Sequence, residues 1–233
     1  MYNVSNVNIG FTRAPRMSQA RKARGAGRTR SYHHGDLRNA LIEAALAQIA
    51  ENGARALSLR EVARAAGVSH SASYRHFPNK ESLLAAIAEQ GFVMLGDAVG
   101  AAVQAHPTEP LAALQASGIA YVEFGVQYPH HLQVMFGGLI GSQADHPGLK
   151  QAAEGTYERL REAVRAAQRS GDLRSGDDRI IALASWAQVH GLALLIAGGQ
   201  IAGEAGEPPP ARYLATEVTR LLQSGLAGPA RKK

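Results

Sequence analysis

Cysteine is absent from this 233-residue chain, which contains one tryptophan and only 6% aromatic residues. Without thiols, the chain can form neither a disulfide scaffold nor a cysteine-based metal site or nucleophile. The adjacent histidine pairs His33-His34 and His130-His131 would point about 100° apart on a helix and would not converge on one ion. The sequence also lacks a P-loop, a G-x-S-x-G elbow, a G-x-G-x-x-G turn and an H-E-x-x-H helix. We therefore predict no catalytic residue, no metal ligand and no cofactor.

Acidic residues are missing from the first 34 positions, which makes the charge distribution uneven. The formal charge is +6 overall, but residues 1–34 carry +7 and residues 231–233 carry +3, which leaves −4 on the residues between them. A basic N-terminal arm favours contact with nucleic acid phosphates; the alternative is a solvated tail that only aids solubility. The arm also resembles an organelle transit peptide, and a native start at Met17 is a further alternative. We predict a disordered arm over residues 1–34 and a basic tail over residues 229–233.

The most informative segment contains two short helices joined by a glycine turn. Ser58 and Glu61 have the spacing of a capping box, which predicts that a helix begins there. Apolar residues then recur at helical spacing: Leu59, Val62, Ala63 and Ala66. Gly67 allows a sharp turn with positive φ, and Ser69 and Asn79 are suitable N-caps for a second and a third helix. This arrangement is typical of a helix-turn-helix.

The second of these helices is rich in hydrogen-bonding side chains, unlike a core helix. The short side chains of residues 70–72 can approach base edges, and the alanine methyl suits a thymine methyl. Tyr74, His76 and Lys80 are placed to hold phosphates, which fix the register without reading the sequence. The predicted DNA-binding residues are Ser58, Arg60, His70, Ser71, Ala72, Tyr74, His76 and Lys80.

Three runs in this segment resemble the TetR family of bacterial transcriptional regulators. They are Leu57-Ser58-Leu59-Arg60-Glu61-Val62-Ala63, Ala66-Gly67-Val68-Ser69 and Tyr74-Arg75-His76-Phe77-Pro78-Asn79-Lys80-Glu81-Ser82-Leu83-Leu84. The resemblance extends to a first helix over residues 36–51. It implies an all-α fold of about nine helices, with a DNA-binding domain over residues 35–80 and an effector-binding and dimerisation domain over residues 81–228. Ser73 departs from the family pattern of leucine or proline, and this departure leaves the base preference open.

After residue 80 the pattern indicates helices only, because apolar residues recur at helical spacing between proline and glycine breaks. We expect a long helix from residue 80 toward residue 106, and further helices over residues 110–128, 129–136, 147–170, 180–198 and 213–225. The segment 180–198 is apolar nearly all round and must be covered on more than one side, although Ser185, Gln188 and His190 would be costly in a membrane. TetR-like proteins dimerise through the last two helices, which implies a four-helix bundle between two copies. The alternative is an intramolecular core helix.

Residues 186–191 read Trp-Ala-Gln-Val-His-Gly, which resembles the Trp-x-x-x-His-Gly signature of the TetR branch named for its WHG-containing C-terminal domain. Trp186 and His190 are four residues apart and share one face of a helix. In one interpretation they line an effector cavity; in the alternative they pack the core. The predicted pocket residues are Tyr121, Phe124, Tyr128, Met135, Phe136, Trp186 and His190.

Three functional hypotheses follow. The first is a cytoplasmic, homodimeric transcriptional regulator with no membrane partner, a repressor of a pseudo-palindromic operator whose DNA affinity falls when a small-molecule effector binds the C-terminal domain. The second is an architectural DNA-binding protein that relies on the basic arm. The third is a helical enzyme with a DNA-binding head, which would use residues such as His131 or His190. The missing catalytic motifs disfavour the third hypothesis.

Overall fold

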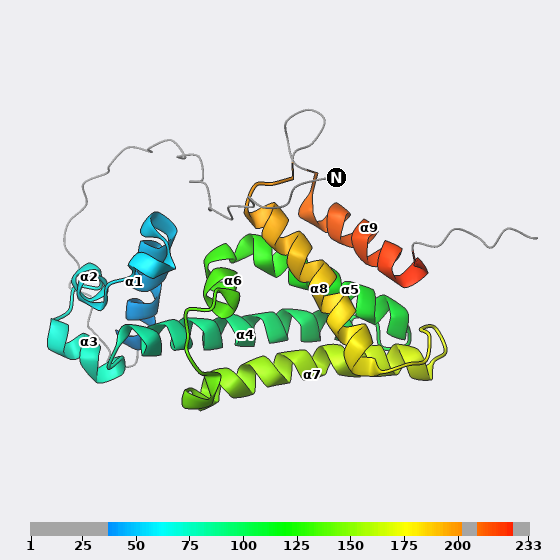
Figure 1. The fold of residues 1–233 in the computed structure, drawn as a ribbon, viewed down its shortest axis with the longest axis horizontal. Helices are drawn as coiled ribbons and strands as arrows, with labels where there is room; N and C mark the ends of the chain where they lie inside the picture. Colours follow the sequence, from blue (N-terminus) through cyan, green and yellow to red (C-terminus); the bar gives the residue numbers. More distant parts are fainter. Residues whose placement is uncertain (1–36, 202–208, 226–233) are drawn as a thin grey trace, which may run out of the picture.

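The computed structural model describes residues 37–201 and 209–225, and these residues form helices and turns without a β-strand (Figure 1). The all-α prediction is confirmed, with nine α-helices and two short 3-10 helices in the described part. Their bounds are α1 Leu37–Asn52, η1 Ala54–Ala56, α2 Leu59–Ala65, α3 His70–His76, α4 Lys80–Gln104, α5 Pro110–Gln127, α6 Pro129–Phe136, η2 Gln143–Asp145, α7 Pro147–Arg169, α8 Asp178–Ala197 and α9 Ala211–Ser224. The predicted arm over residues 1–34 and tail over residues 229–233 lie outside the described residues.

Local caps fix where several helices begin. Ser69 caps α3, because its Oγ accepts a hydrogen bond of 3.2 Å from the amide of Ala72. Asn79 and Ser82 form a reciprocal capping box at the start of α4, in which Oδ1 of Asn79 accepts from the Ser82 amide at 2.8 Å. Three helices begin with a proline, whose fixed φ suits the first turn and whose missing N–H costs nothing there. These are α5, α6 and α7, at Pro110, Pro129 and Pro147.

The capping box predicted at Ser58 is wrong. The Ser58 hydroxyl makes no capping hydrogen bond, although α2 does begin at the next residue. Gln48 of α1 takes over the role expected of Glu61: its Oε1 accepts from the Ser58 amide at 3.0 Å, and its Nε2 donates to the Glu61 carboxylate. A side chain from a neighbouring helix therefore replaces the local partner, and this contact ties α2 to α1.

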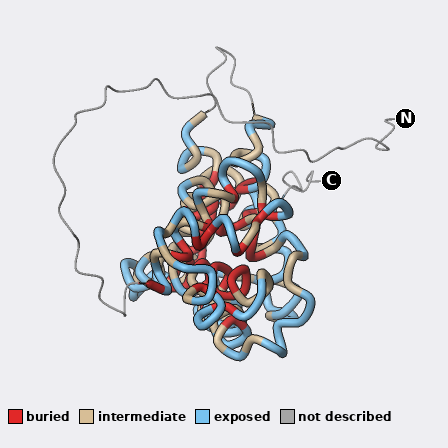
Figure 2. The backbone as a smooth tube through the Cα atoms, turned by 90° about the vertical axis from the view of Figure 1, so that its left-hand side faces the viewer, coloured by how far each residue is buried: buried red, intermediate tan, exposed pale blue. Residues whose placement is uncertain are grey.

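The long helix α4 organises the molecule (Figure 1). The three helices α1–α3, which we call the head, lie at its N-terminal end; of the helices α5–α9, which we call the body, α5, α6 and α7 pack along the remainder. In the body α7 runs beside α4, and α5 lies between α4 on one side and α8 and α9 on the other. Figure 2 shows the buried residues concentrated where these helices meet. The fold thus connects head and body through a single continuous helix.

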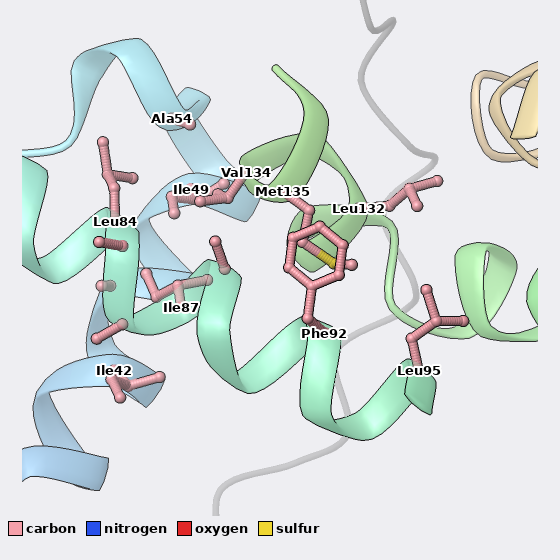
Figure 3. Packing of buried hydrophobic residues seen from close by; sticks show 14 of the residues in the cluster. Ile42, Ile49, Ala54, Leu84, Ile87, Phe92, Leu95, Leu132, Val134 and Met135 are labelled. Atoms are coloured by element: carbon pink, nitrogen blue, oxygen red, sulfur yellow. The ribbon is translucent and has the colours of Figure 1, made fainter. Parts of the chain in front are cut away.

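The junction between head and body is closely packed (Figure 3). Ile49 of α1, Ile87 of α4 and Val134 of α6 are all buried in the same hydrophobic cluster. At Gly91 of α4, an added Cβ would lie only 2.5 Å from Sδ of Met135 in α6. Because a methyl group has no room there, α4 and α6 approach each other closely. Helix α6 therefore packs against both α4 and α1 of the head.

Two helices, α4 and α8, are long and apolar enough to cross a membrane by length and composition. In α4, 61% of the apolar stretch is buried inside the protein, as expected of a core helix. In α8, only 22% of the stretch is buried. The other described residues of a single chain therefore leave one apolar face of α8 uncovered.

Candidate functional site

The predicted DNA-binding residues fall into an exposed and a half-buried group. His70, Ser71, Tyr74 and His76 of α3 are exposed, as is Arg60 of α2. The rings of His70 and Tyr74 contact each other edge to face, with centroids 4.6 Å apart. These side chains form one polar surface on α2 and α3 that no other described element covers.

The half-buried group comprises Ser58, Ala72 and Lys80, whose side chains reach solvent only in part. Nζ of Lys80 donates a 2.6 Å hydrogen bond to the main-chain oxygen of Arg55. The ammonium group is thus held at the start of α4, on the side of the head where η1 and α4 meet. Arg75 is also exposed on α3, although it was not among the predicted residues.

Ser73 does not lie on the DNA-binding surface. Its side chain is 0% exposed, and its Oγ donates a 2.8 Å hydrogen bond to the main-chain oxygen of His70. The departure from the family pattern at this position therefore places no additional group on the exposed side of α3, and the base preference stays open. Ser73 faces α2 and the core of the head, where its hydroxyl is satisfied by its own helix.

A cavity of about 860 Å³ lies in the body. Its walls come from α4, α5, α7, α8 and α9, and its head-proximal end is formed by Phe136 of α6 and Gln143 of the following loop. Phe92, Leu95 and Val99 of α4 form one apolar wall. This volume lies within the range of small-molecule sites, so the geometry permits a ligand in direct contact with α4.

Only part of the predicted pocket set lines this cavity. Tyr121, Phe136 and Trp186 are among the lining residues. The other four predicted residues contribute no lining: Phe124, Tyr128, Met135 and His190. Phe124 is buried against Tyr128, with ring centroids 5.3 Å apart. Met135 fills the contact with Gly91, so an apolar helix face that looked suitable for a cavity is occupied by a neighbouring helix.

His190 does not line the cavity, but it contacts Tyr121, which does. Trp186 Nε1 donates to the Tyr121 hydroxyl at 3.2 Å, and that hydroxyl lies 2.8 Å from Nδ1 of His190. Burial lowers the pKa of His190, which favours the neutral ring. Burial also raises the pKa of Tyr121, so its hydroxyl keeps its proton while it shares a hydrogen bond with Nδ1 of His190. The tryptophan and histidine of the Trp-x-x-x-His-Gly motif therefore hold Tyr121 from both sides, which fixes the ring that the cavity meets.

Sequence reasoning missed the contribution of α4 and α7 to the cavity. Thr156 and Tyr157 of α7 line it opposite α5, together with the α4 residues already named. The signal was present, because Tyr157 and Leu160 share an apolar side of an otherwise charged segment. That pattern marks a face that packs inward, but it does not show whether the face meets another helix or a void.

The loop between α6 and α7, residues 137–146, joins the cavity to the start of α4. Gln143 lines the cavity, while the amide of Gly141 donates to Oε1 of Glu81 at 2.9 Å. Nε2 of His146 lies 3.8 Å from the same carboxylate oxygen. Since Glu81 stands in the first turn of α4, one loop touches both the cavity and the helix turn that follows α3.

Comparison with known proteins matches both parts of the chain. The family model described as bacterial regulatory proteins, tetR family, covers residues 41–87, and one described as tetracyclin repressor-like, C-terminal domain, covers residues 114–221. The chain belongs to the TetR family. It is therefore a DNA-binding transcriptional regulator, and the hypothesis of a helical enzyme is set aside because this is a family of regulators. Membership of the WHG branch stays a prediction.

Individual relatives agree with this assignment. The HTH-type transcriptional regulator BetI of Rhizobium meliloti (strain 1021) is 39% identical over 79 residues, which span 33% of this chain and only 39% of BetI. A protein of unknown function from Rhodococcus sp. RHA1 is 34% identical, with a TM-score of 0.71 over 85% of this chain and 100% of that one. AibR, solved in complex with isovaleryl coenzyme A and operator DNA, is 20% identical, with a TM-score of 0.63 over 79% of this TetR-family chain and 97% of AibR. At that identity, AibR shows the shared fold alone.

Proposed function

We propose that this regulator is a cytoplasmic, homodimeric repressor whose operator affinity falls when a small-molecule effector occupies the cavity of the body. The observation that carries the proposal is the position of the cavity against α4, the helix that begins four residues after α3 ends. A ligand in contact with Phe92 or Leu95 touches the same rigid element that holds the DNA-binding surface. AibR, with which the chain shares its fold, was solved with both an acyl coenzyme A and operator DNA.

The α6–α7 loop supplies a second route between cavity and head. A ligand that displaces Gln143 would shift the loop, and the loop is bonded to Glu81 at the start of α4. The cavity and the operator are then coupled reciprocally: an effector that weakens DNA binding is itself bound more weakly by the DNA complex.

The uncovered apolar faces of α8 and α9 support the dimer. Large apolar side chains outside the cavity lining are exposed on both helices of one chain: Leu183, Leu194, Leu195, Tyr213 and Leu221. A second copy that packs α8 and α9 against the same helices of the first would bury this face in a four-helix bundle. The two heads would then meet two half-sites of a pseudo-palindrome, spaced by about one helical turn of DNA, roughly 34 Å, or a multiple of it.

The proposal is tested with the full-length protein and DNA flanking its own gene. We expect a specific complex that persists in excess random duplex; equally tight binding to random duplex would favour the architectural alternative. A thermal-shift screen would identify ligands, and each ligand would then be tested for release of labelled operator. Ala153→Phe, which places a ring in the cavity from α7, is the matched control: it should bind the operator but fail to release it. Release that is unchanged in this variant would contradict an effector site in the cavity.

A further inference from the structure

Most side-chain donors on the cavity wall are engaged within the protein; among the described lining residues, the Tyr157 hydroxyl and the Gln143 amide are exceptions. The four serine and threonine hydroxyls of the lining each donate to a main-chain oxygen at 2.7 to 3.0 Å: Ser117, Thr156, Ser185 and Thr219. The Tyr121 hydroxyl is shared with Trp186 and His190. A polar or charged ligand group placed between these walls would lose its water and gain few partners. The enclosed part of a ligand must therefore be apolar.

Charge occurs at one place only among the described residues that line the cavity. Asp172, Arg174 and Asp177 all belong to the turn between α7 and α8, residues 170–177. Both carboxylates have partners within the turn: Asp172 accepts from Ser170 Oγ at 2.7 Å, and Asp177 accepts from the Arg179 amide at 2.9 Å as the N-cap of α8. Arg174 differs, because within the described residues its guanidinium has no ion pair.

The side chain of Arg174 does not hold the turn together. Gln168 Nε2 donates to the main-chain oxygens of Arg174 and Gly176, at 3.1 Å each, so the main chain and not the guanidinium fixes the geometry. A guanidinium offers a fork of donors that matches a carboxylate. Among the described lining residues Arg174 is thus the one cation that could receive a ligand anion; it lies at one end of the cavity, in the same turn as two carboxylates that have other partners.

We propose that the cavity takes an amphipathic organic acid, whose apolar part lies between α4, α5 and α8 and whose carboxylate lies at Arg174. The wall that α8 provides from Ile180 to Val189 is about 13 Å long at a rise of 1.5 Å per residue, which suits a medium-length alkyl chain or an extended ring system. The inner end meets the rings of Phe136 and Trp186, whose centroids are 5.6 Å apart. This inference rests on the proposed function, since it names the chemical class of the effector for the same cavity.

The test uses octanoate, decanoate, decanol and decylamine below their micelle-forming concentrations. Trp186 is the only tryptophan of the chain and lines the cavity, so its fluorescence reports occupancy, and calorimetry supplies an independent affinity. We expect decanoate to bind about tenfold more tightly than octanoate, because two further methylenes are buried. Decanoate should also bind about fivefold more tightly than decanol and more tightly still than decylamine.

Matched variants separate the contribution of the ligand's carboxylate from that of its apolar chain. Arg174→Gln should abolish the preference for decanoate over decanol and leave decanol affinity unchanged, whereas Arg179→Gln, an exposed arginine outside the lining, should keep the preference. Equal affinities for octanoate and decanoate, tighter binding of decylamine, or a preference that survives Arg174→Gln would overturn the proposal. So would binding that persists in both Ala153→Phe and Ala184→Phe, which fill the cavity from α7 and α8, because the acid would then sit elsewhere.

Failure of this inference is distinguishable from failure of the proposed function. If decanoate binds as expected but does not release the operator, the ligand class stands and the repressor mechanism fails. If a compound without an acid group occupies the cavity and releases the operator while the acids do not bind, the mechanism stands and the ligand class is overturned.

Discussion

Leu195 offers the most direct test of the proposed dimer. It lies near the end of α8, where its side chain is 45% exposed in a single chain. In the proposed four-helix bundle a second copy covers this exposed part, and each substitution occurs twice because the two chains are identical. We predict that Leu195→Lys weakens the dimer without unfolding the chain, since the side chain lies on a surface that the body does not use.

The magnitude follows from the exposed fraction. Full burial of a leucine side chain contributes about 1.5 to 3 kcal/mol, so covering the remaining 45% contributes about 0.7 to 1.4 kcal/mol per chain and about 1.4 to 2.7 kcal/mol per dimer. This corresponds to a dimer dissociation constant raised about 10- to 100-fold. Desolvation of the introduced ammonium adds to the effect if it cannot reach water.

Sedimentation equilibrium over a range of concentrations measures that constant. Val93→Lys is the matched control, because Val93 is 50% exposed on α4, away from α8 and α9, and should leave the constant unchanged. Operator affinity should fall with dimer affinity, since a single head makes too few contacts to bind tightly. An unchanged dimer in Leu195→Lys, or an equal loss in Val93→Lys, would refute a dimer interface on α8.

Four further predictions concern the head and its connection to the cavity. His70→Ala should change the ranking of operator variants by about 1 to 3 kcal/mol in anisotropy titrations, whereas Lys80→Ala should weaken all variants alike; a uniform loss for both would contradict the base-reading role. Ser73→Ala should leave the ranking unchanged, because the side chain is buried, and should cost about 1 kcal/mol in urea unfolding through one lost hydrogen bond. Glu81→Ala removes the hydrogen bond between the α6–α7 loop and α4, so it should reduce effector-induced operator release without changing effector affinity. Paired titrations of effector binding and operator release measure both quantities, and release that stays intact would exclude this route. Deletion of residues 1–30 should lower the slope of log affinity against log salt concentration if the arm meets phosphates, and an unchanged slope would identify a bystander tail.

Helix starts were predictable where the capping partners lie within the same turn. Ser69 and Asn79 each bond a residue three positions later, so the sequence alone contains both partners. Ser58 and Glu61 have the same spacing, yet Gln48 of α1 displaces their mutual contact from ten residues upstream. The residues of one turn indicate which side chains can cap a helix, but packing between helices determines which available partner makes the hydrogen bond.

The cavity was harder to predict for a related reason. Phe136 and Trp186 were expected there and do line it, whereas Met135, next in sequence to Phe136, fills the gap above Gly91. The hydrophobic periodicity predicts that both Phe136 and Met135 face inward, because it indicates only which face of a helix is buried. Whether that face lines a cavity or packs against another helix depends on how closely α4 and α6 approach each other. Gly91 permits the close approach, and it lies 44 positions before Met135 in the sequence.

The two sides of α8 couple the cavity to the proposed dimer. Ser185, Trp186 and Val189 line the cavity, while Leu183 and Leu195 stand exposed on the uncovered apolar face. On the proposed assembly, a ligand and a second copy would therefore press on the same helix from different sides. Because the dimer has two identical ligand sites, linkage then requires that saturating ligand changes the dimer dissociation constant by the square of the factor by which dimerisation changes the affinity of each site. Sedimentation with and without saturating ligand measures the change in the dimer dissociation constant, and calorimetry below and above that constant measures the change in ligand affinity. If neither quantity changes although the ligand binds, coupling between the cavity and the dimer through α8 is refuted.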